Sequence, residues 1–381
     1  MEDVALTIDG NKIKLVSSAN GVRQSVAVLR QAKELALDLE FDQNRHTYGF
    51  NLCLIQISDG ETCYLFDPFT VEDLKPVWQL FEDPAITKII HHANNDILLL
   101  NKLGCNIRNV IDTDVAAKIL NYEKSSLATV LAEDFKIELD KSQQSSNWNT
   151  RPLTEEQLHY AALDVNYLHR VKDRLVTEIK QKGRLHWLEE EGRLLEQIEY
   201  TEPQDPHLRL KTARNLTYFQ IFLLKELFSF REKLAQAANK PSAFIIPNDA
   251  LVDLARNPDT DVYEFINSTR GIHRSLKTAR NEERLRQVLQ KARNRAEAHN
   301  IGHDFPPPYR RPVRNRETNM RDEALSKVQE EIVRVYGAYA SRLIITSSVI
   351  SEYAFTGKLN VQKQYALDII LETAKALNIT L

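Results

Sequence analysis

The amino-acid sequence predicts an α/β domain built on a mixed β-sheet, followed by a region that is entirely helical. Two patterns indicate this. Up to about residue 180, segments with the two-residue alternation of strands exchange with segments in which apolar residues recur at helical spacing. After about residue 200, only the helical spacing recurs. Strands in series that later alternate with helices are typical of an α/β domain with a mixed sheet.

Length and composition limit the kind of protein. A chain of 381 residues is long enough for two or three domains. Its 43% hydrophobic and 27% charged residues are typical of a soluble globular protein, and no apolar run approaches the ~20 residues of a membrane span. The start Met-Glu-Asp-Val lacks the features of a secretory signal, and three cysteines form no framework, so we expect a cytoplasmic protein without membrane contact. The net charge of −3 confines any nucleic-acid surface to a local patch.

The expected elements of the first domain follow from turn residues and apolar spacing. The pair Asp59-Gly60 predicts a tight hairpin between two strands. Strands are expected at residues 4–8, 12–17, 35–42, 51–57, 61–66 and 87–91, and helices at 21–33, at 71–81 and from a cap at Asn94 or Asn95 onward.

The strand at residues 35–42 carries acidic residues on one face. Asp38, Glu40 and Asp42 alternate with apolar residues, so their side chains share the face opposite the apolar one. Same-face neighbours lie roughly 7 Å apart, and ionised carboxylates at that spacing raise one another's pKa. A hard divalent cation such as Mg²⁺ would relieve the repulsion. An acidic face exposed to water is the alternative.

A second acidic residue follows the strand at residues 87–91. Asp96 falls in the first turn of the next helix, at an edge of the sheet where α/β proteins usually bind ligands. Its alternative role is to stabilise the helix dipole alone. The neighbouring His91 and His92 are interpreted as wall or core residues, because nothing nearby completes a metal-binding set.

A third motif lies in residues 151–164. Thr154 and Gln157 form the pattern of a capping box, which predicts a regular helix from Glu155 onward. In such a helix Tyr160 and Asp164 share a face. An aspartate on a largely apolar helix needs a partner or a metal, and an Asp–Tyr contact at a domain boundary would also satisfy it.

Together these motifs resemble the DEDD 3′–5′ exonucleases of the tyrosine subclass. The run from Leu139 through Asn147-Trp148 to Asp164 is similar to the ribonuclease D family, although Asn147 stands where that family commonly has Asp. His159 would also fit the histidine pattern of the sister subclass, but in a regular helix it points away from Asp164, so we favour Tyr160.

The resemblance implies an RNase H-like sheet and a set of site residues. It implies two divalent metal ions, Mg²⁺ or Mn²⁺, with Asp38 bridging both and Tyr160 orienting and helping to deprotonate the attacking water. The implied metal ligands are Asp38, Glu40, Asp96 and Asp164, and the implied catalytic residues are these four with Tyr160.

The function that the resemblance implies is 3′–5′ exoribonuclease activity. Such an enzyme removes nucleotides from RNA 3′ ends, tRNA precursors among them, and releases nucleoside 5′-monophosphates. Two alternatives stay open: a DNA 3′–5′ exonuclease would use the same acids, and a non-catalytic nucleic-acid-binding scaffold would keep the fold. Oligomeric state is not indicated.

The helical region is expected to hold two further domains. The run Phe230-Arg-Glu-Lys-Leu-Ala, with Pro241 and the segment Pro247 to Ala255, resembles the HRDC domain. We expect an exonuclease domain at residues 1–200, an HRDC domain at 207–298 and a degenerate HRDC-like domain at 317–381, with the first two joined by a linker at 201–206. Within residues 207–298, helices are expected over 216–238, from Asn248 or Asp249, from Asn257 and over 273–298.

A basic strip runs from Arg270 to Arg316. Such a strip could follow a phosphate backbone, or it could be a solvated helix face. The candidates for nucleic-acid contact are Arg270, Arg274, Lys277, Arg280 and Arg284.

Overall fold

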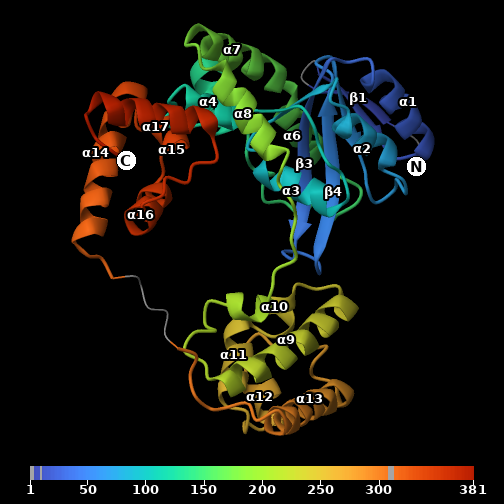
Figure 1. Ribbon diagram of the computed structural model, residues 1–381. Helices are drawn as coiled ribbons and strands as arrows, with labels where there is room; N and C mark the ends of the chain where they lie inside the picture. The colour runs from blue at the N-terminus through green and yellow to red at the C-terminus, as the bar shows by residue number, and fades with distance from the viewer. Residues whose placement is uncertain (1–3, 9–10, 308–312) are drawn as a thin grey trace.

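The structure is a computed structural model that describes residues 4–8, 11–307 and 313–381. Arg310 and Arg311 of the basic strip lie outside the described residues. Figure 1 shows an α/β body, a group of helices below it and a second group beside it. Within the described residues, no helix combines the length and the apolar content needed to cross a bilayer.

The described residues form one seven-stranded sheet in the order β1-β2-β5-β4-β3-β6-β7. The pairs β1/β2, β3/β4 and β4/β5 are antiparallel, and β2/β5, β3/β6 and β6/β7 are parallel, which confirms the predicted mixed sheet. The strands are β1 (Val4–Ile8), β2 (Asn11–Val16), β3 (Glu34–Gln43), β4 (Phe50–Ser58), β5 (Thr62–Phe66), β6 (Thr87–Ile90) and β7 (Val110–Asp112).

Helices cover both faces of the sheet, because successive side chains of β3 point to opposite faces and pack in different cores. Leu35, Leu37 and Leu39 pack in one core with α1, α2 and α3, whereas Ala36 packs in a second core with α6 on the opposite face. Asp38 and Glu40 lie two and four residues after Ala36 in the strand, so their side chains point to the same face, toward α6. The helices of the body are α1 (Ala19–Leu29), α2 (Lys75–Glu82), α3 (Asn94–Lys102), α4 (Thr113–Ile119), α5 (Leu127–Val130), the π-helix η1 (Leu131–Phe135), α6 (Glu155–Asn166), α7 (Leu168–Gln181) and α8 (Leu185–Leu195).

Several predicted helix starts were wrong. Helix α2 begins at Lys75 rather than residue 71, because Pro76 is favourable only in the first turn. Asn94 and Asn95 are helical residues of α3, whose cap is Ala93. Strand β7 and helices α4 and α5 were not predicted at all.

The predicted helical region is confirmed, and its first group of helices has its own core. Leu223, Leu227 and Phe230 of α9 pack there against α11 and α13. The predicted starts of α12 and α13 were wrong: Asp261 and Thr278 cap these helices and accept hydrogen bonds from backbone N–H groups of the first turn. This group contains the 3₁₀-helix η2 (Pro206–Arg209), α9 (Tyr218–Ala238), α10 (Ser242–Ile245), α11 (Asn248–Arg256), α12 (Val262–Ser268) and α13 (Ala279–Ala298).

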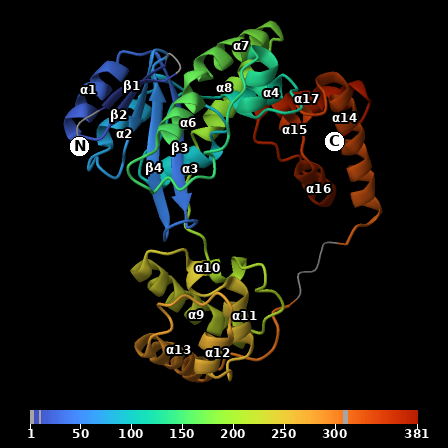
Figure 2. The same ribbon diagram turned by 180° about the vertical axis from the view of Figure 1, so that it is seen from behind.

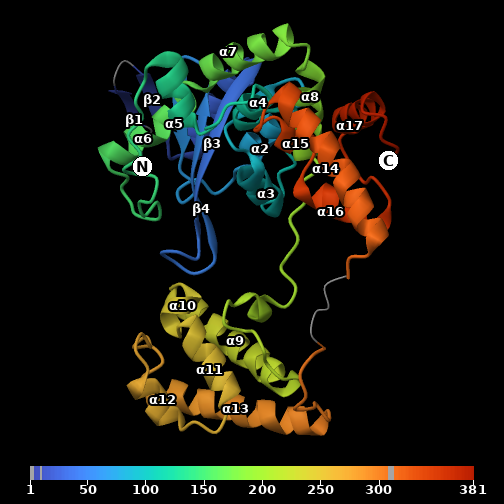
Figure 3. The ribbon, with the colours of Figure 1, turned by 90° about the vertical axis from the view of Figure 1, so that its left-hand side faces the viewer.

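The last helices share a core with the body. They are α14 (Arg316–Tyr336), α15 (Ser341–Ile344), α16 (Ser347–Thr356) and α17 (Gln364–Ala376). Their apolar residues join those of α4, α7 and α8 in one cluster, and Figure 2 shows α14–α17 beside α4 and α8. By contrast, α9–α13 lie beyond the tip of the β3–β4 hairpin (Figure 3), where Tyr48 packs against their core and its backbone N–H donates to Asn239.

Candidate active site

Three carboxylates from two elements converge on the α6 side of the sheet. Asp38 and Glu40 come from β3, and Asp164 comes from α6, which packs across the strands through Ala161 and Ala162. One side-chain oxygen of each residue lies within 4.8 Å of the others. The sequence therefore brings together acids that lie more than 120 positions apart.

The position of α6 is fixed by its first turn and by the segment before it. Thr154 and Gln157 form the predicted capping box, with both reciprocal hydrogen bonds present. Just before it, Arg151 donates to both carboxylate oxygens of Asp67, at 2.7 and 2.9 Å, and to the Cys53 carbonyl on β4. Because these contacts anchor the start of the helix to the sheet, the next turns carry Tyr160 and Asp164 over β3.

Asp96 lies in the first turn of α3, as predicted, and lines the same cavity as the other three acids. Its side chain is buried, and its charge contributes to raising the pKa of both Asp38 and Glu40. This coupling places the fourth carboxylate within electrostatic reach of the first two.

Tyr160, rather than His159, faces Asp164. The Tyr160 hydroxyl donates a hydrogen bond to the Asp164 carboxylate, and its ring lies 6.0 Å from that of Trp148. Tyr160 lines the cavity with the acids, and His159 is not among the lining residues. The Asn147 side chain, where the family has Asp, accepts from the backbone N–H of Asn149.

The electrostatics of the site favour a cation. Burial, followed by the charge of Asp164, raises the pKa of both Asp38 and Glu40 well above the usual range. Burial raises the pKa of Asp96 and Asp164 to about 7. Across the described parts of the chain, no Lys or Arg forms an ion pair with any of these four. The charge of Lys141 lowers the pKa of Asp164 only in part, and closely spaced carboxylate oxygens with so little counter-charge from the protein fit a hard divalent cation.

The cavity is about 540 Å³ and extends beyond the acids to residues whose role was not predicted. Asp114 and Lys118 of α4, with Lys141, belong to its wall. The i,i+4 spacing of Asp114 and Lys118 is a helical pairing signal that could have revealed them. Of the two histidines interpreted as wall or core residues, His91 is partly buried and hydrogen-bonds to Thr113, and His92 is exposed on the wall.

The basic candidates lie elsewhere. They occupy the α12–α13 connection and the start of α13, are all exposed, and do not line the cavity. They are Arg270, Arg274, Lys277, Arg280 and Arg284.

Comparison with known proteins gives consistent matches. A family model described as a 3′–5′ exonuclease matches residues 13–180. Ribonuclease D of Shewanella sp. (strain ANA-3) is 35% identical over 250 residues, which cover 63% of this chain and 63% of that protein. Ribonuclease D of Desulfotalea psychrophila is 32% identical over 260 residues, covering 67% of this chain and 69% of that protein. The match therefore spans just under two thirds of the Shewanella relative.

A solved structure shares the fold over nearly the whole chain. The crystal structure of Escherichia coli RNase D has a TM-score of 0.70 and 24% identity, and the match covers 95% of this chain and 97% of that one. At this identity the likeness concerns the fold, and it includes the helical region as well as the α/β body.

Proposed function

The chain belongs to the ribonuclease D family of 3′–5′ exonucleases, and we propose that it is a metal-dependent exoribonuclease acting on RNA 3′ ends. One observation carries the proposal: Asp38, Glu40 and Asp164 present oxygens within 4.8 Å of one another in a cavity that is also lined by Asp96 and Tyr160. Hydrolysis of a phosphodiester builds negative charge on its oxygens, and this residue set is suited to hold the cations that offset it.

The proposed cofactor is a pair of divalent ions, Mg²⁺ or Mn²⁺. Asp38, Glu40 and Asp164 would hold one ion and Asp38 with Asp96 the other. When bound, the ions supply an activated water and stabilise the leaving 3′-oxygen. Tyr160 keeps the Asp164 carboxylate oriented through its hydroxyl, and it would also orient and help to deprotonate the attacking water.

The proposed substrate is RNA, and the products are nucleoside 5′-monophosphates. The E. coli relative is titled an exoribonuclease involved in structured RNA processing. We extend that class to this chain, with tRNA precursors as the first candidates. We also propose that residues 207–298 are an HRDC domain whose exposed basic residues contact RNA, and that residues 317–381 are a second, degenerate unit. The three buried free cysteines support a cytoplasmic location.

The test is a comparison of matched RNA and DNA oligonucleotides labelled at the 5′ end, incubated with Mg²⁺, Mn²⁺ or EDTA. We expect a ladder that shortens from the 3′ end of RNA and stops in EDTA. Asp38→Asn should reduce the rate by at least about 10³-fold, because the ligands act as a unit.

The matched control is Asp73→Asn, which changes an exposed aspartate outside the cavity and should leave the rate unchanged. Faster degradation of DNA would replace the RNA assignment with the DNA alternative. Absence of metal-dependent cleavage of either polymer would favour the scaffold alternative.

A further inference from the structure

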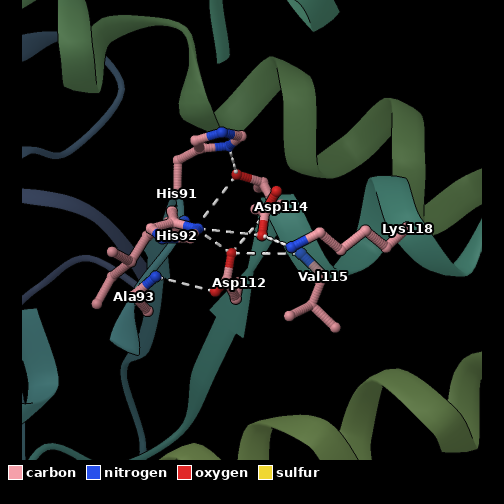
Figure 4. Close-up of polar contacts among 9 residues, drawn as sticks. His91, His92, Ala93, Asp112, Asp114, Val115 and Lys118 are labelled. Atoms are coloured by element: carbon pink, nitrogen blue, oxygen red, sulfur yellow. Dashed lines mark hydrogen bonds and ion pairs between the residues drawn. The ribbon is translucent and has the colours of Figure 1, made fainter. Parts of the chain in front are cut away.

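Beside the acidic residues, the cavity wall carries a second group of charged side chains, His92, Asp114 and Lys118, here called the His92 cluster. His92 lies in the turn between β6 and α3, four residues before Asp96, and the other two lie one turn apart on α4. Asp114 Oδ2 is 3.3 Å from His92 Nδ1 and 2.5 Å from Lys118 Nζ. Figure 4 shows the two basic side chains converging on this carboxylate, and all three residues line the cavity.

A neighbouring aspartate fixes the backbone of the turn. Asp112 accepts hydrogen bonds from the backbone N–H groups of His92 and Ala93, both at 2.9 Å, and from that of Asp114 at 2.8 Å (Figure 4). His92 has a φ of 63°, in the left-handed region that non-glycine residues rarely adopt. Such a conformation is strained and persists where surrounding contacts impose it, often at functional sites. The imidazole is therefore held in place from both its backbone and its side chain.

The three side chains of the cluster differ in burial: Asp114 is buried, whereas His92 and Lys118 are accessible to a ligand. The Asp114 side chain is 7% exposed, whereas those of His92 and Lys118 are 63% and 37% exposed. Since Asp114 engages Nδ1 of His92, Nε2 is the ring nitrogen left for another partner. The buried Asp114 carboxylate thus positions the His92 imidazole and the Lys118 ammonium group at the cavity.

Charge indicates what these groups bind. The floor of the cavity is acidic, and its basic lining residues are His91, His92, Lys118 and Lys141. A polyanionic strand that enters this cavity needs cationic partners next to the acids as well as metal ions on them. Ammonium and imidazole groups are suitable hydrogen-bond donors for phosphate oxygens.

We propose that His92 and Lys118, positioned by Asp114, bind the RNA backbone phosphate that neighbours the scissile phosphate. The proposal rests on the exoribonuclease function proposed above, in which the four acids would hold the divalent ions that bind the scissile phosphate. Because the His92 turn leads directly into the helix start that carries Asp96, the cluster lies beside the acids, where the next phosphate of the strand would come.

The test compares two substrates that differ by one phosphate. A 5′-hydroxyl RNA dinucleotide contains only the scissile phosphate, and a 5′-hydroxyl RNA trinucleotide also contains the neighbouring one. For His92→Gly and Lys118→Met, we expect the KM for the trinucleotide to rise about tenfold with kcat unchanged, the loss of one charged hydrogen bond. The wild-type preference for the trinucleotide in kcat/KM should shrink by the same factor.

The variants are chosen so that folding is retained. Glycine adopts the left-handed backbone of residue 92 without steric cost, so His92→Gly removes the imidazole and relieves the strain. Lys118→Arg keeps the charge and should retain most of the wild-type KM. Lys124→Met is the matched control, because Lys124 is exposed close by in the chain but does not line the cavity.

Salt dependence gives a second readout. On the trinucleotide, the slope of log(kcat/KM) against log[NaCl] is negative and should become less steep by about 0.7 in Lys118→Met, the contribution of one phosphate contact to a single strand. Lys124→Met should keep the wild-type slope.

Equal losses on both substrates, or an unchanged KM for the trinucleotide, would overturn the phosphate contact while leaving the proposed function intact. A wild-type protein that cleaves neither these substrates nor longer RNA with either metal would overturn the proposed function itself, and this contact with it.

Discussion

At the level of single residues, the phenol of Tyr160 combines a packing role with a polar one. Its ring packs beside the ring of Trp148, and its hydroxyl donates a hydrogen bond to the Asp164 carboxylate. Tyr160→Phe keeps the ring and removes only the hydroxyl. We expect kcat on RNA to fall by about 10²-fold, within the usual range for one positioned polar group, with KM nearly unchanged. Steady-state kinetics with Mg²⁺ measures this.

The control for Tyr160 is its neighbour His159, the residue that the histidine subclass would use. His159→Gln should keep the wild-type kcat, because His159 does not line the cavity. A large loss in His159→Gln together with normal activity in Tyr160→Phe would contradict the assignment of Tyr160.

Lys88 gives a stability prediction independent of activity. Its side chain is fully buried in β6, and Nζ donates to the carbonyls of Asp83 and Ile86, both at 2.6 Å. Burial lowers the pKa of Lys88 to about 8. An unfolded lysine keeps its proton up to about pH 10.4. Between these values the unfolded chain binds more protons, so the free energy of unfolding contributed by Lys88 rises with pH.

Lys88→Met removes this titration while keeping a side chain of similar size. Relative to this variant, the wild-type protein should therefore gain stability between pH 7.5 and pH 9.5, measured as the free energy of unfolding in urea. Lys33→Met, which changes an exposed lysine, serves as the control. A difference between wild type and Lys88→Met that is the same at both pH values would show that the buried amine does not titrate in this range.

The residues of the site differ in how far sequence could reveal them. Asp38 and Glu40 follow from alternation in one strand, and Tyr160 with Asp164 from spacing in one helix. These signals are local. The His92 conformation depends instead on hydrogen bonds to Asp112, twenty positions away, so no local pattern predicts it. Asp114 and Lys118 were missed because helix α4, which carries them, was not predicted, although their i,i+4 spacing is a local signal.

At the level of elements, the end of β3 depends on Asp42. Its buried carboxylate accepts from the backbone N–H groups of Arg45 and Thr47 at 2.8 and 2.9 Å, and from the side chain of Asn149 at 2.8 Å. Although burial raises the pKa of Asp42, these hydrogen bonds outweigh it, and the net shift is downward. Asp42 thus ties the β3–β4 turn to the segment that precedes α6.

Asp42→Ala should loosen this junction. We expect a loss of about 3 kcal/mol in the free energy of unfolding, since hydrogen bonds to a charged group are worth about 1.5–3 kcal/mol each and water replaces some of them. Amide exchange at residues 45–47 should become faster. Asp59→Ala is the matched control, because Asp59 accepts from two backbone N–H groups in the β4–β5 turn. Unchanged exchange at residues 45–47 in Asp42→Ala would contradict this role.

Helix starts show the limit of prediction at this level. The start of α6 was predicted because its capping box consists of residues three apart. The start of α3 was not, because its cap residue is Ala93, whose backbone N–H donates to Asp112 on another element. Caps formed within one turn can be read from sequence, and caps supplied by tertiary contacts cannot.

At the level of the whole molecule, the two helical groups relate differently to the body. Helices α14–α17 share one apolar core with α4, α7 and α8, whereas α9–α13 enclose a core of their own that the body reaches through Tyr48. Helical spacing in the sequence predicted both groups. It could not predict which of them packs against the body, because that depends on pairs such as Trp187 and Tyr365, which lie far apart in the chain.

This arrangement predicts two cooperative units, and calorimetry with one variant in each core tests it. Trp187 is 3% exposed, stacks on Tyr365 at a centroid distance of 4.8 Å and lies 5.4 Å from Tyr336, so it joins α8 to both α17 and α14. Trp187→Ala should lower the stability of the body and α14–α17 together by about 3–5 kcal/mol, and Leu227→Ala that of α9–α13 by about 2–5 kcal/mol.

Each variant is the control for the other. Because few contacts link the two cores, Trp187→Ala should shift one transition and leave the other in place, and Leu227→Ala should do the reverse. A single transition that moves in both variants would mean that Tyr48 couples the helices to the body more strongly than its hydrogen bonds to Asn239 and Glu232 and its local packing indicate. A separate transition for α14–α17 would mean that the shared core around Trp187 does not join those helices to the body in one folding unit.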